Sequence, residues 1–416
     1  MTSRPSVQLG FGGVAAFYTF AACSGLRTSA LPEVEPADAA GGDATDPGHA
    51  DGASSGQDAR GGRDGDGEAP CIEAIPDDPR HCGACRHDCL GGACAGDRCL
   101  PVLLADDCKV LSDLVVAGQT AYFMESGPTM QEARIRRAST SCQAGGDCAQ
   151  SFLDTPNGAY LAADLEHLYF TRGSLGAGAV WRTAFDGTGT ESFLDVEGVG
   201  SLALGGGTLF AVSQGSGNQD GAIITKDVED LNGLDDAGAE PFAFVENLDS
   251  PFDVVFDGFS IFFSTRGPFG IPTEGQIWRA DVGTTDQGTL ADSQNNVRSL
   301  AVNARHVFWV NSGNGTVQRA TRDGGQPLEL QAGCRTPYAI LVAGDRLVWT
   351  ERGSAPDYLD GRVQSTDLDG GNLVTLIDEL PSPIQLAQDD AAIYVASRGT
   401  NLGEYRDGKI YKVAKP

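Results

Sequence analysis

A motif that recurs seven times between residues 101 and 416 constrains the fold of this chain more than any other feature. Each copy has a short strand with aromatic or β-branched residues, a glycine within five residues, and then a short strand that alternates apolar and polar residues. The copies of the aromatic strand begin 40 to 52 residues apart, at Tyr122, Tyr169, Phe210, Phe262, Phe308, Val348 and Tyr394. Four short strands in a unit of about 45 residues are typical of a propeller blade, so the sequence predicts an all-β, seven-bladed β-propeller over 101–416.

The two ends of this region predict how the ring closes. The seventh copy stops at Pro416 directly after its third strand, so its outermost strand is missing. The segment Pro101–Ala105 precedes the first copy and is similar to the outer strands Phe152–Asp154 and Thr375–Asp378. We expect this N-terminal segment to complete the last blade, because closure removes an exposed sheet edge.

Several copies also resemble known propeller repeats. LYFTRG at Leu168–Gly173, FWVNSG at Phe308–Gly313 and VWTERG at Val348–Gly353 resemble the repeats of YWTD and NHL-type propellers. YWTD rings have six blades, and the aspartate of their motif is mostly absent here. The resemblance therefore implies the fold and no particular ligand.

The first 23 residues predict export. Arg4 is followed by an apolar stretch over 7–22, which is short for a membrane-spanning helix and ends in small residues, as a signal peptide does. Its last residues before Cys23 resemble the bacterial lipobox, although Phe20 stands where that pattern prefers leucine. The resemblance implies a lipoprotein with palmitate or similar acyl chains on Cys23, and Ser24 favours an outer-membrane or cell-surface location. The alternative is a signal peptide cut nearby and a secreted or periplasmic protein.

Residues 24–70 predict a disordered tether. They are mainly Ala, Gly, Asp, Ser and Pro, with no aromatic residue and ten acids against three arginines. Such a segment cannot bury enough apolar surface to offset its loss of conformational entropy. A flexible chain of this length would hold the folded part roughly 35–40 Å from the membrane.

Residues 71–100 predict a small disulfide-rich module. The run Asp78–Cys89 resembles Cys-rich modules found beside propellers in bacterial lipoproteins, and its Cys-Gly-x-Cys spacing is similar to that of the plant Stig1-like proteins. In an oxidising compartment we expect three disulfides among six cysteines, with fifteen possible connectivities. The alternative is zinc bound by Cys82 and Cys85 with His81 or His87. The six cysteines are Cys71, Cys82, Cys85, Cys89, Cys94 and Cys99.

Four more cysteines lie in the propeller region. Cys142 and Cys148 are six residues apart after the third strand of the first blade, which predicts a small disulfide loop. Cys108 and Cys334 both lie in segments that enter an inner strand, and therefore on the same face of the ring. We expect these two to pair, with free buried thiols as the alternative.

Charge and motifs narrow the function. The net charge of −28 disfavours nucleic acid as a partner. The propeller histidines His167 and His306 precede second strands, where we expect turn residues, and no phosphate-binding or zinc-protease motif is present. The acidic residues between Asp230 and Asp236 lack regular calcium-ligand spacing. The sequence therefore predicts no enzyme, cofactor or metal. The alternative is a propeller lyase, lactonase or glycosidase that uses carboxylates or a metal near the axis.

One pattern points to a binding face. Arginines precede the glycine that ends the second strand in blades 2, 4, 6 and 7, namely Arg172, Arg266, Arg352 and Arg398. The repeat places them on one face of the ring, where they either bind an anionic glycan or carboxylate or pair locally with acids such as Asp154, Asp195, Glu246 or Asp378. We expect a monomeric, membrane-anchored, extracytoplasmic binding or scaffold module with a protein or glycan ligand.

Overall fold

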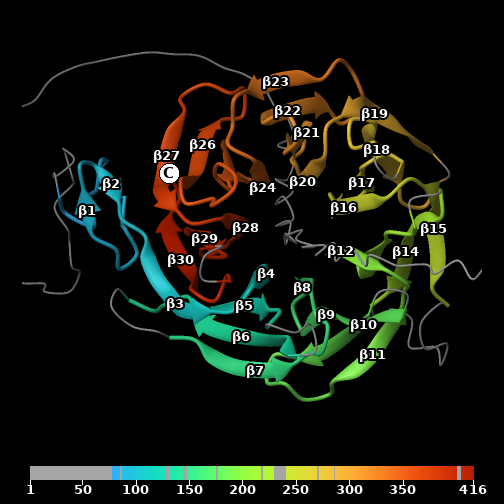
Figure 1. Ribbon diagram of the computed structural model, residues 1–416, viewed down its shortest axis with the longest axis horizontal. Helices are drawn as coiled ribbons and strands as arrows, with labels where there is room; N and C mark the ends of the chain where they lie inside the picture. Colours follow the sequence, from blue (N-terminus) through green and yellow to red (C-terminus); the bar gives the residue numbers. More distant parts are fainter. Residues whose placement is uncertain are drawn as a thin grey trace, which may run out of the picture.

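Seven four-stranded antiparallel sheets are arranged radially in the computed structural model of this chain (Figure 1). The structure describes residues 77–84, 87–127, 132–143, 148–174, 177–216, 219–228, 240–268, 271–284, 286–400 and 404–416. All the secondary-structure elements among the described propeller residues are β-strands, joined by turns and irregular segments. The predicted all-β, seven-bladed propeller is therefore confirmed.

Within each blade the strands follow one another from the axis outward. Blades 1 and 2 consist of β4 (Leu111–Ala117), β5 (Thr120–Glu125), β6 (Arg134–Ser139), β7 (Gln150–Asp154), β8 (Leu161–Ala163), β9 (His167–Ser174), β10 (Ala177–Ala184) and β11 (Glu191–Asp195). Blades 3 and 4 consist of β12 (Val199–Gly205), β13 (Thr208–Ser213), β14 (Gly221–Asp227), β15 (Phe242–Leu248), β16 (Pro251–Phe256), β17 (Ser260–Thr265), β18 (Gly275–Asp281) and β19 (Gln287–Gln294). Blades 5 and 6 consist of β20 (Val297–Val302), β21 (His306–Asn311), β22 (Thr316–Thr321), β23 (Leu328–Gln331), β24 (Pro337–Ala343), β25 (Arg346–Glu351), β26 (Gly361–Asp367) and β27 (Val374–Leu380).

The seventh blade is built from both ends of the propeller sequence. It contains β28 (Pro383–Gln388), β29 (Ala392–Ser397) and β30 (Gly408–Ala414), with β3 (Val102–Cys108) as its outermost strand. In Figure 1 the cyan β3 lies directly beside the red β30. The register pairs Val102 with Lys412 and Leu103 with Tyr411. The predicted closure by an N-terminal strand is confirmed.

The arginines of the second strands share one face of the ring, which we name the arginine face. In three blades the backbone N–H of this arginine donates to the carbonyl just before an inner strand: Arg266 to Ser250 at 3.1 Å, Arg352 to Thr336 at 3.0 Å and Arg398 to Ser382 at 3.0 Å. The turns that enter the inner strands therefore lie on this face. The histidines His167 and His306 begin β9 and β21, at the opposite end of the second strands.

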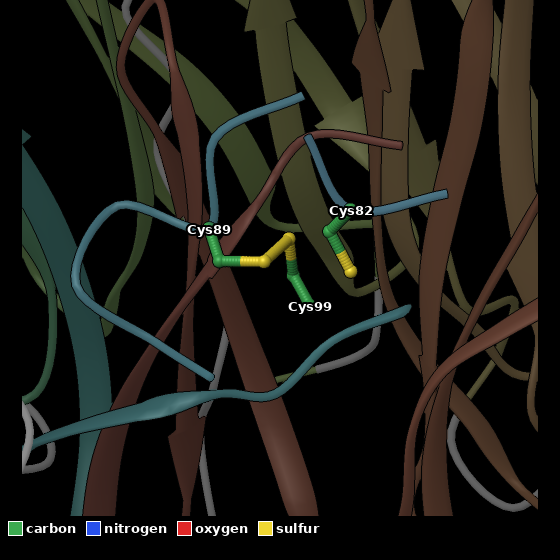
Figure 2. A group of neighbouring side chains, drawn as sticks. All are labelled: Cys82, Cys89 and Cys99. Carbon is green, nitrogen blue, oxygen red and sulfur yellow. A yellow bond between two sulfur atoms is a disulfide. The ribbon is translucent and has the colours of Figure 1, made fainter. Parts of the chain in front are cut away.

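Part of the Cys-rich segment is described. It forms a two-stranded sheet of β1 (Cys94–Ala95) and β2 (Arg98–Cys99), with disulfides Cys82–Cys94 and Cys89–Cys99. Figure 2 shows Cys82, Cys89 and Cys99 side by side. Their sulfurs lie within 4.8 Å of one another, but all three are committed to disulfides and so are not thiolate ligands for zinc. Cys71 and Cys85 lie outside the described residues.

This segment packs against the end of the propeller chain. The four cysteines cluster with Ala414, and the His87 ring contacts the Lys415 carbonyl through Nε2 at 3.0 Å. The predicted lipid site Cys23 and the tether 24–70 lie outside the described residues, as does the acidic loop at Asp230. In the part of the chain that the structure describes, no helix has the length and apolarity needed to cross a bilayer.

The cysteines of the propeller correct one prediction. Cys142 and Cys148 form the expected disulfide, but Cys108 and Cys334 are not joined. Cys108 ends β3 of blade 7, and its Sγ lies 3.8 Å from Arg136 Nη1 of blade 1. Cys334 follows β23 of blade 5 and leads into blade 6, where burial raises the pKa of its thiol to about 12. The repeat predicted their common face but not that a whole blade separates them.

Candidate anion-binding site on the arginine face

A belt of polar residues lies near the starts of the inner strands, at the end of the blades that carries the arginine face. Six of the described inner strands carry a bulge near their start: β4, β12, β16, β20, β24 and β28. A bulge re-aims the side chains beside it. The polar residues at these positions include Asp113, Ser201, Asp253, Ser299 and Gln385, and they connect neighbouring blades.

Asp113 is the clearest member of the belt. It is fully buried, and its carboxylate accepts hydrogen bonds from Leu114 N, from Leu161 N of blade 2 and from Gln385 Nε2 of blade 7, each at 2.8 Å. Burial raises the pKa of Asp113 well above its ordinary value, against the lowering effect of these hydrogen bonds, and the charge of Asp253 adds to the rise. Asp113 therefore ties three blades together.

Asp253 has the same role on the other side of the ring. It is also fully buried, and its carboxylate accepts hydrogen bonds from Ser201 Oγ of blade 3 at 2.8 Å and from Leu300 N of blade 5 at 2.8 Å. Val254 N donates to it at 3.1 Å. Asp113 and Asp253 are carboxylates near the axis, as the enzyme alternative requires. However, donors from the inner strands occupy their oxygens, which favours a structural role.

Arg266 stands out among the predicted arginines. Its guanidinium carbon lies 3.3 Å from the centre of the Phe252 ring, in a cation–π contact. Its Nε and Nη2 atoms are buried, and no protein group accepts a hydrogen bond from them. Burial, together with the nearby charge of Arg298, lowers the pKa of Arg266 to about 9. Its positive charge is thus held in an unfavourable setting.

Arg298 belongs to the same cluster, although the sequence did not single it out. It lies near the start of β20, 5.6 Å from the Phe252 ring centre and 5.1 Å from that of Tyr338. Its Nε donates to Ser312 Oγ at 3.3 Å. Blades 4, 5 and 6 thus contribute two arginines and two aromatic rings to one place, which we name the Arg266–Arg298 cluster (Phe252, Arg266, Arg298 and Tyr338).

Two other predicted arginines meet at Tyr405. Arg352 donates through Nη2 to the Tyr405 hydroxyl at 3.2 Å and through Nε to Ser382 Oγ at 3.0 Å. Arg398 lies 5.5 Å from the Tyr405 ring centre, and its Nε donates to the Leu111 carbonyl at 3.0 Å. Blades 6 and 7 therefore form a second cationic cluster.

Arg172 of blade 2 lies apart from both clusters. Its guanidinium carbon is 4.8 Å from the Trp181 ring centre. The four predicted arginines therefore share a face, but they divide into separate positions around the ring.

The local pairing that we considered as an alternative is not seen for three of these arginines. Within the described ranges, Arg172, Arg266 and Arg352 form no ion pair with any acid, including those suggested by the sequence. The buried acids on this face instead pair with third-strand arginines. Glu125 contacts Arg134 at 2.8 Å and Arg136 at 2.9 Å, and Glu351 contacts Arg362 at 2.9 Å.

Comparison with known proteins supports the fold. No family model matches this chain, and no curated protein matches its sequence. A streptogramin B lyase structure aligns with a TM-score of 0.54 and 13% identity, covering 76% of this chain and 97% of that one. A catalytically inactive histidine-to-alanine variant of virginiamycin B lyase from Staphylococcus aureus, with quinupristin, gives 0.54 and 14% over 76% and 99%.

The propeller domain of the Trilobed protease from Pyrococcus furiosus gives a TM-score of 0.53 and 11% identity, over 73% of this chain and 94% of that one. That domain is described as having an open velcro topology, whereas in this chain β3 closes the last blade. At these identities the likeness shows the propeller fold alone.

Proposed function

We propose that this chain is an extracytoplasmic binding module that holds an anionic ligand on its arginine face. The observation that carries the proposal is Arg266, a partly buried arginine. Its Nε and Nη2 atoms are covered, no protein group accepts a hydrogen bond from them, and the side chain has no acidic partner among the described residues. Buried charges in proteins are normally paired. An anionic ligand would supply the missing partner.

The overall charge makes this face distinctive. The chain carries 57 acids against 29 lysines and arginines, yet Arg172, Arg266 and Arg352 have aromatic neighbours in place of acids. On a strongly acidic protein, unpaired arginines form a local positive patch that attracts anions and discriminates against neutral ligands. An anionic glycan or another carboxylate-bearing ligand fits this chemistry.

The disulfides support the location. Three are present among the described residues, which is typical of proteins in oxidising compartments. We further propose that Cys23 carries a lipid anchor at the outer membrane or cell surface and that residues 24–70 tether the propeller to it. A rigid disc on a flexible tether can capture a ligand at a distance from the bilayer.

Binding is favoured over catalysis by the same geometry. One lyase of this fold is inactive as a histidine-to-alanine variant. In this chain both propeller histidines begin second strands, on the face opposite the arginines. Burial and the charge of Arg319 lower the pKa of His306. Among the described residues, the two buried aspartates accept hydrogen bonds from inner-strand donors, and Glu125 and Glu351 pair with arginines, which favours binding over acid–base catalysis.

If the arginine face binds an anionic ligand, then removing arginines from this face should weaken the binding of such a ligand. The double substitution Arg172→Ala with Arg352→Ala should weaken binding to immobilised alginate, a carboxylate polysaccharide, at least about tenfold, because each charged hydrogen bond contributes about 1 kcal/mol or more. Biolayer interferometry at two salt concentrations would measure it, and added salt should weaken wild-type binding. Arg305→Ala, an exposed arginine of the opposite face, is the matched control and should change little. Equal binding by the double variant and wild type would contradict the proposal.

A further inference from the structure

The geometry points to a specific subsite within this face: the Arg266–Arg298 cluster binds a doubly charged oxyanion of the phosphate-monoester class. This inference rests on the proposed function and makes it narrower. It assigns the charge-bearing group of the ligand to blades 4, 5 and 6, and it gives Arg298 a binding role that the repeat pattern does not indicate.

The first support is the edge of Arg266 that lacks acceptors. Nε and Nη2 lie on the same edge of a guanidinium group, and together they present two parallel N–H bonds. An oxyanion can accept both bonds with two of its oxygens, in the bidentate geometry that arginine forms with carboxylate and phosphate. Both atoms are buried and have no protein acceptor. The donor pair therefore has no acceptor within the protein, and an oxyanion that reaches this edge would supply both.

The second support is the charge count at this place. Arg298 approaches the same Phe252 ring as Arg266, and its charge helps to lower the Arg266 pKa. Two cations near each other in a desolvated setting repel, and a dianion neutralises both, whereas a monoanion leaves one charge uncompensated. Elsewhere on this face the chain balances its buried charges, since Glu125 and Glu351 each contact arginines directly.

The third support is the aromatic frame. Phe252 and Tyr338 contact the guanidinium groups without neutralising them, because an aromatic ring offers only its quadrupole. This preserves the full positive charge for a ligand. Because Nε and Nη2 are covered, the Arg266 side chain must turn away from Phe252 for its edge to meet the oxyanion. The two buried donors gain acceptors in that step, which offsets the lost contact with the ring.

Calorimetric titration of the full purified chain with sulfate, phosphate and acetate, at constant ionic strength, tests the subsite. We expect sulfate and phosphate to bind at least about tenfold more tightly than acetate, and sulfate to raise the melting temperature. Arg266→Met and Arg298→Met should each weaken sulfate binding about tenfold or more. Arg266→Lys keeps the charge but lacks the two-donor edge, and it should also weaken binding; Arg305→Met should not.

The outcomes distinguish the oxyanion subsite from the proposed function, which is the binding of an anionic ligand anywhere on the arginine face. If acetate binds as tightly as sulfate, or if folded Arg266→Met and Arg266→Lys variants bind sulfate as wild type does, the subsite is wrong. If alginate binding is still lost in the Arg172→Ala, Arg352→Ala variant, the proposed function survives that result. If wild type binds neither oxyanions nor alginate, both proposals fail. Melting temperatures of all variants, measured without ligand, show which of them are folded.

Discussion

Leu104→Ala should reduce the free energy of unfolding by about 3 kcal/mol, because it opens a cavity in the strand that closes the ring. Leu104 is fully buried in β3 and belongs to the core cluster that contains Phe123 of blade 1 and Ile410 of blade 7. A loss here weakens the pairing of β3 with β30, through which β3 becomes the fourth strand of the seventh blade. Urea unfolding followed by circular dichroism would measure the change.

Leu103 provides a matched control for this prediction. It is the adjacent residue in the same strand and of the same type, but it faces the other side of the sheet and is only partly buried. Leu103→Ala should therefore lower the free energy of unfolding by less than about 1.5 kcal/mol. Equal losses for the two leucines would show that β3 does not dock in this register.

The ring itself could be predicted because its signal is redundant. Every blade repeats an aromatic strand, a glycine and an alternating strand, so an error in one copy does not change the count. The closing strand could be predicted because the last copy lacks its outer strand and Pro101–Ala105 resembles one. The observed strand is longer and runs to Cys108. The length of β3 depends on how many of its residues pair with β30, and the sequence of β3 alone does not determine this.

The repeat predicts on which face of the ring a residue lies better than it predicts which residues of different blades are close together. It placed Cys108 and Cys334 on one face, but a disulfide between them also requires neighbouring blades. Cys108 ends β3 of blade 7, just before blade 1, whereas Cys334 lies between blades 5 and 6. The arginines illustrate the same limit. Their common face follows from the motif, whereas the division into clusters depends on which blades stand side by side.

The residues that the sequence reading missed lie next to bulges. Phe252 and Arg298 come from the starts of inner strands, directly before the belt residues Asp253 and Ser299, and Tyr338 has the same position in β24, directly before Ala339. Simple alternation assigns side chains to faces correctly only where no extra residue intervenes. A signal was nevertheless present, since aligning the seven inner strands places a polar residue before an aliphatic one in most copies, as in Asp113-Leu114 and Asp253-Val254.

Substitution of Asp113, in the polar belt of the inner strands, is the second change for which we expect a large loss of stability. Asp113→Ala should lower the free energy of unfolding by about 3–4 kcal/mol, because it removes the acceptor of Leu161 N and Gln385 Nε2 and leaves buried donors unsatisfied in two neighbouring blades. Ser112 is a close control: it precedes Asp113 and is buried, and no protein group bonds to its hydroxyl. Ser112→Ala should change stability by less than about 0.5 kcal/mol.

The pH dependence of the same residue separates its charge from its hydrogen bonds. Burial raises the pKa of Asp113 above its ordinary value of 3.8, so between that value and the raised one the folded protein binds more protons than the unfolded chain. The contribution of Asp113 to stability is therefore largest at acid pH and falls as the pH rises through this window. Asp113→Asn cannot ionise, so the stability of wild type minus that of this variant should decrease as the pH rises above 3.8, the ordinary pKa of an aspartate. Urea midpoints for both proteins across this range would measure the difference; a difference that rises with pH would mean that Asp113 is held as a stabilised carboxylate, and that its hydrogen bonds outweigh its burial.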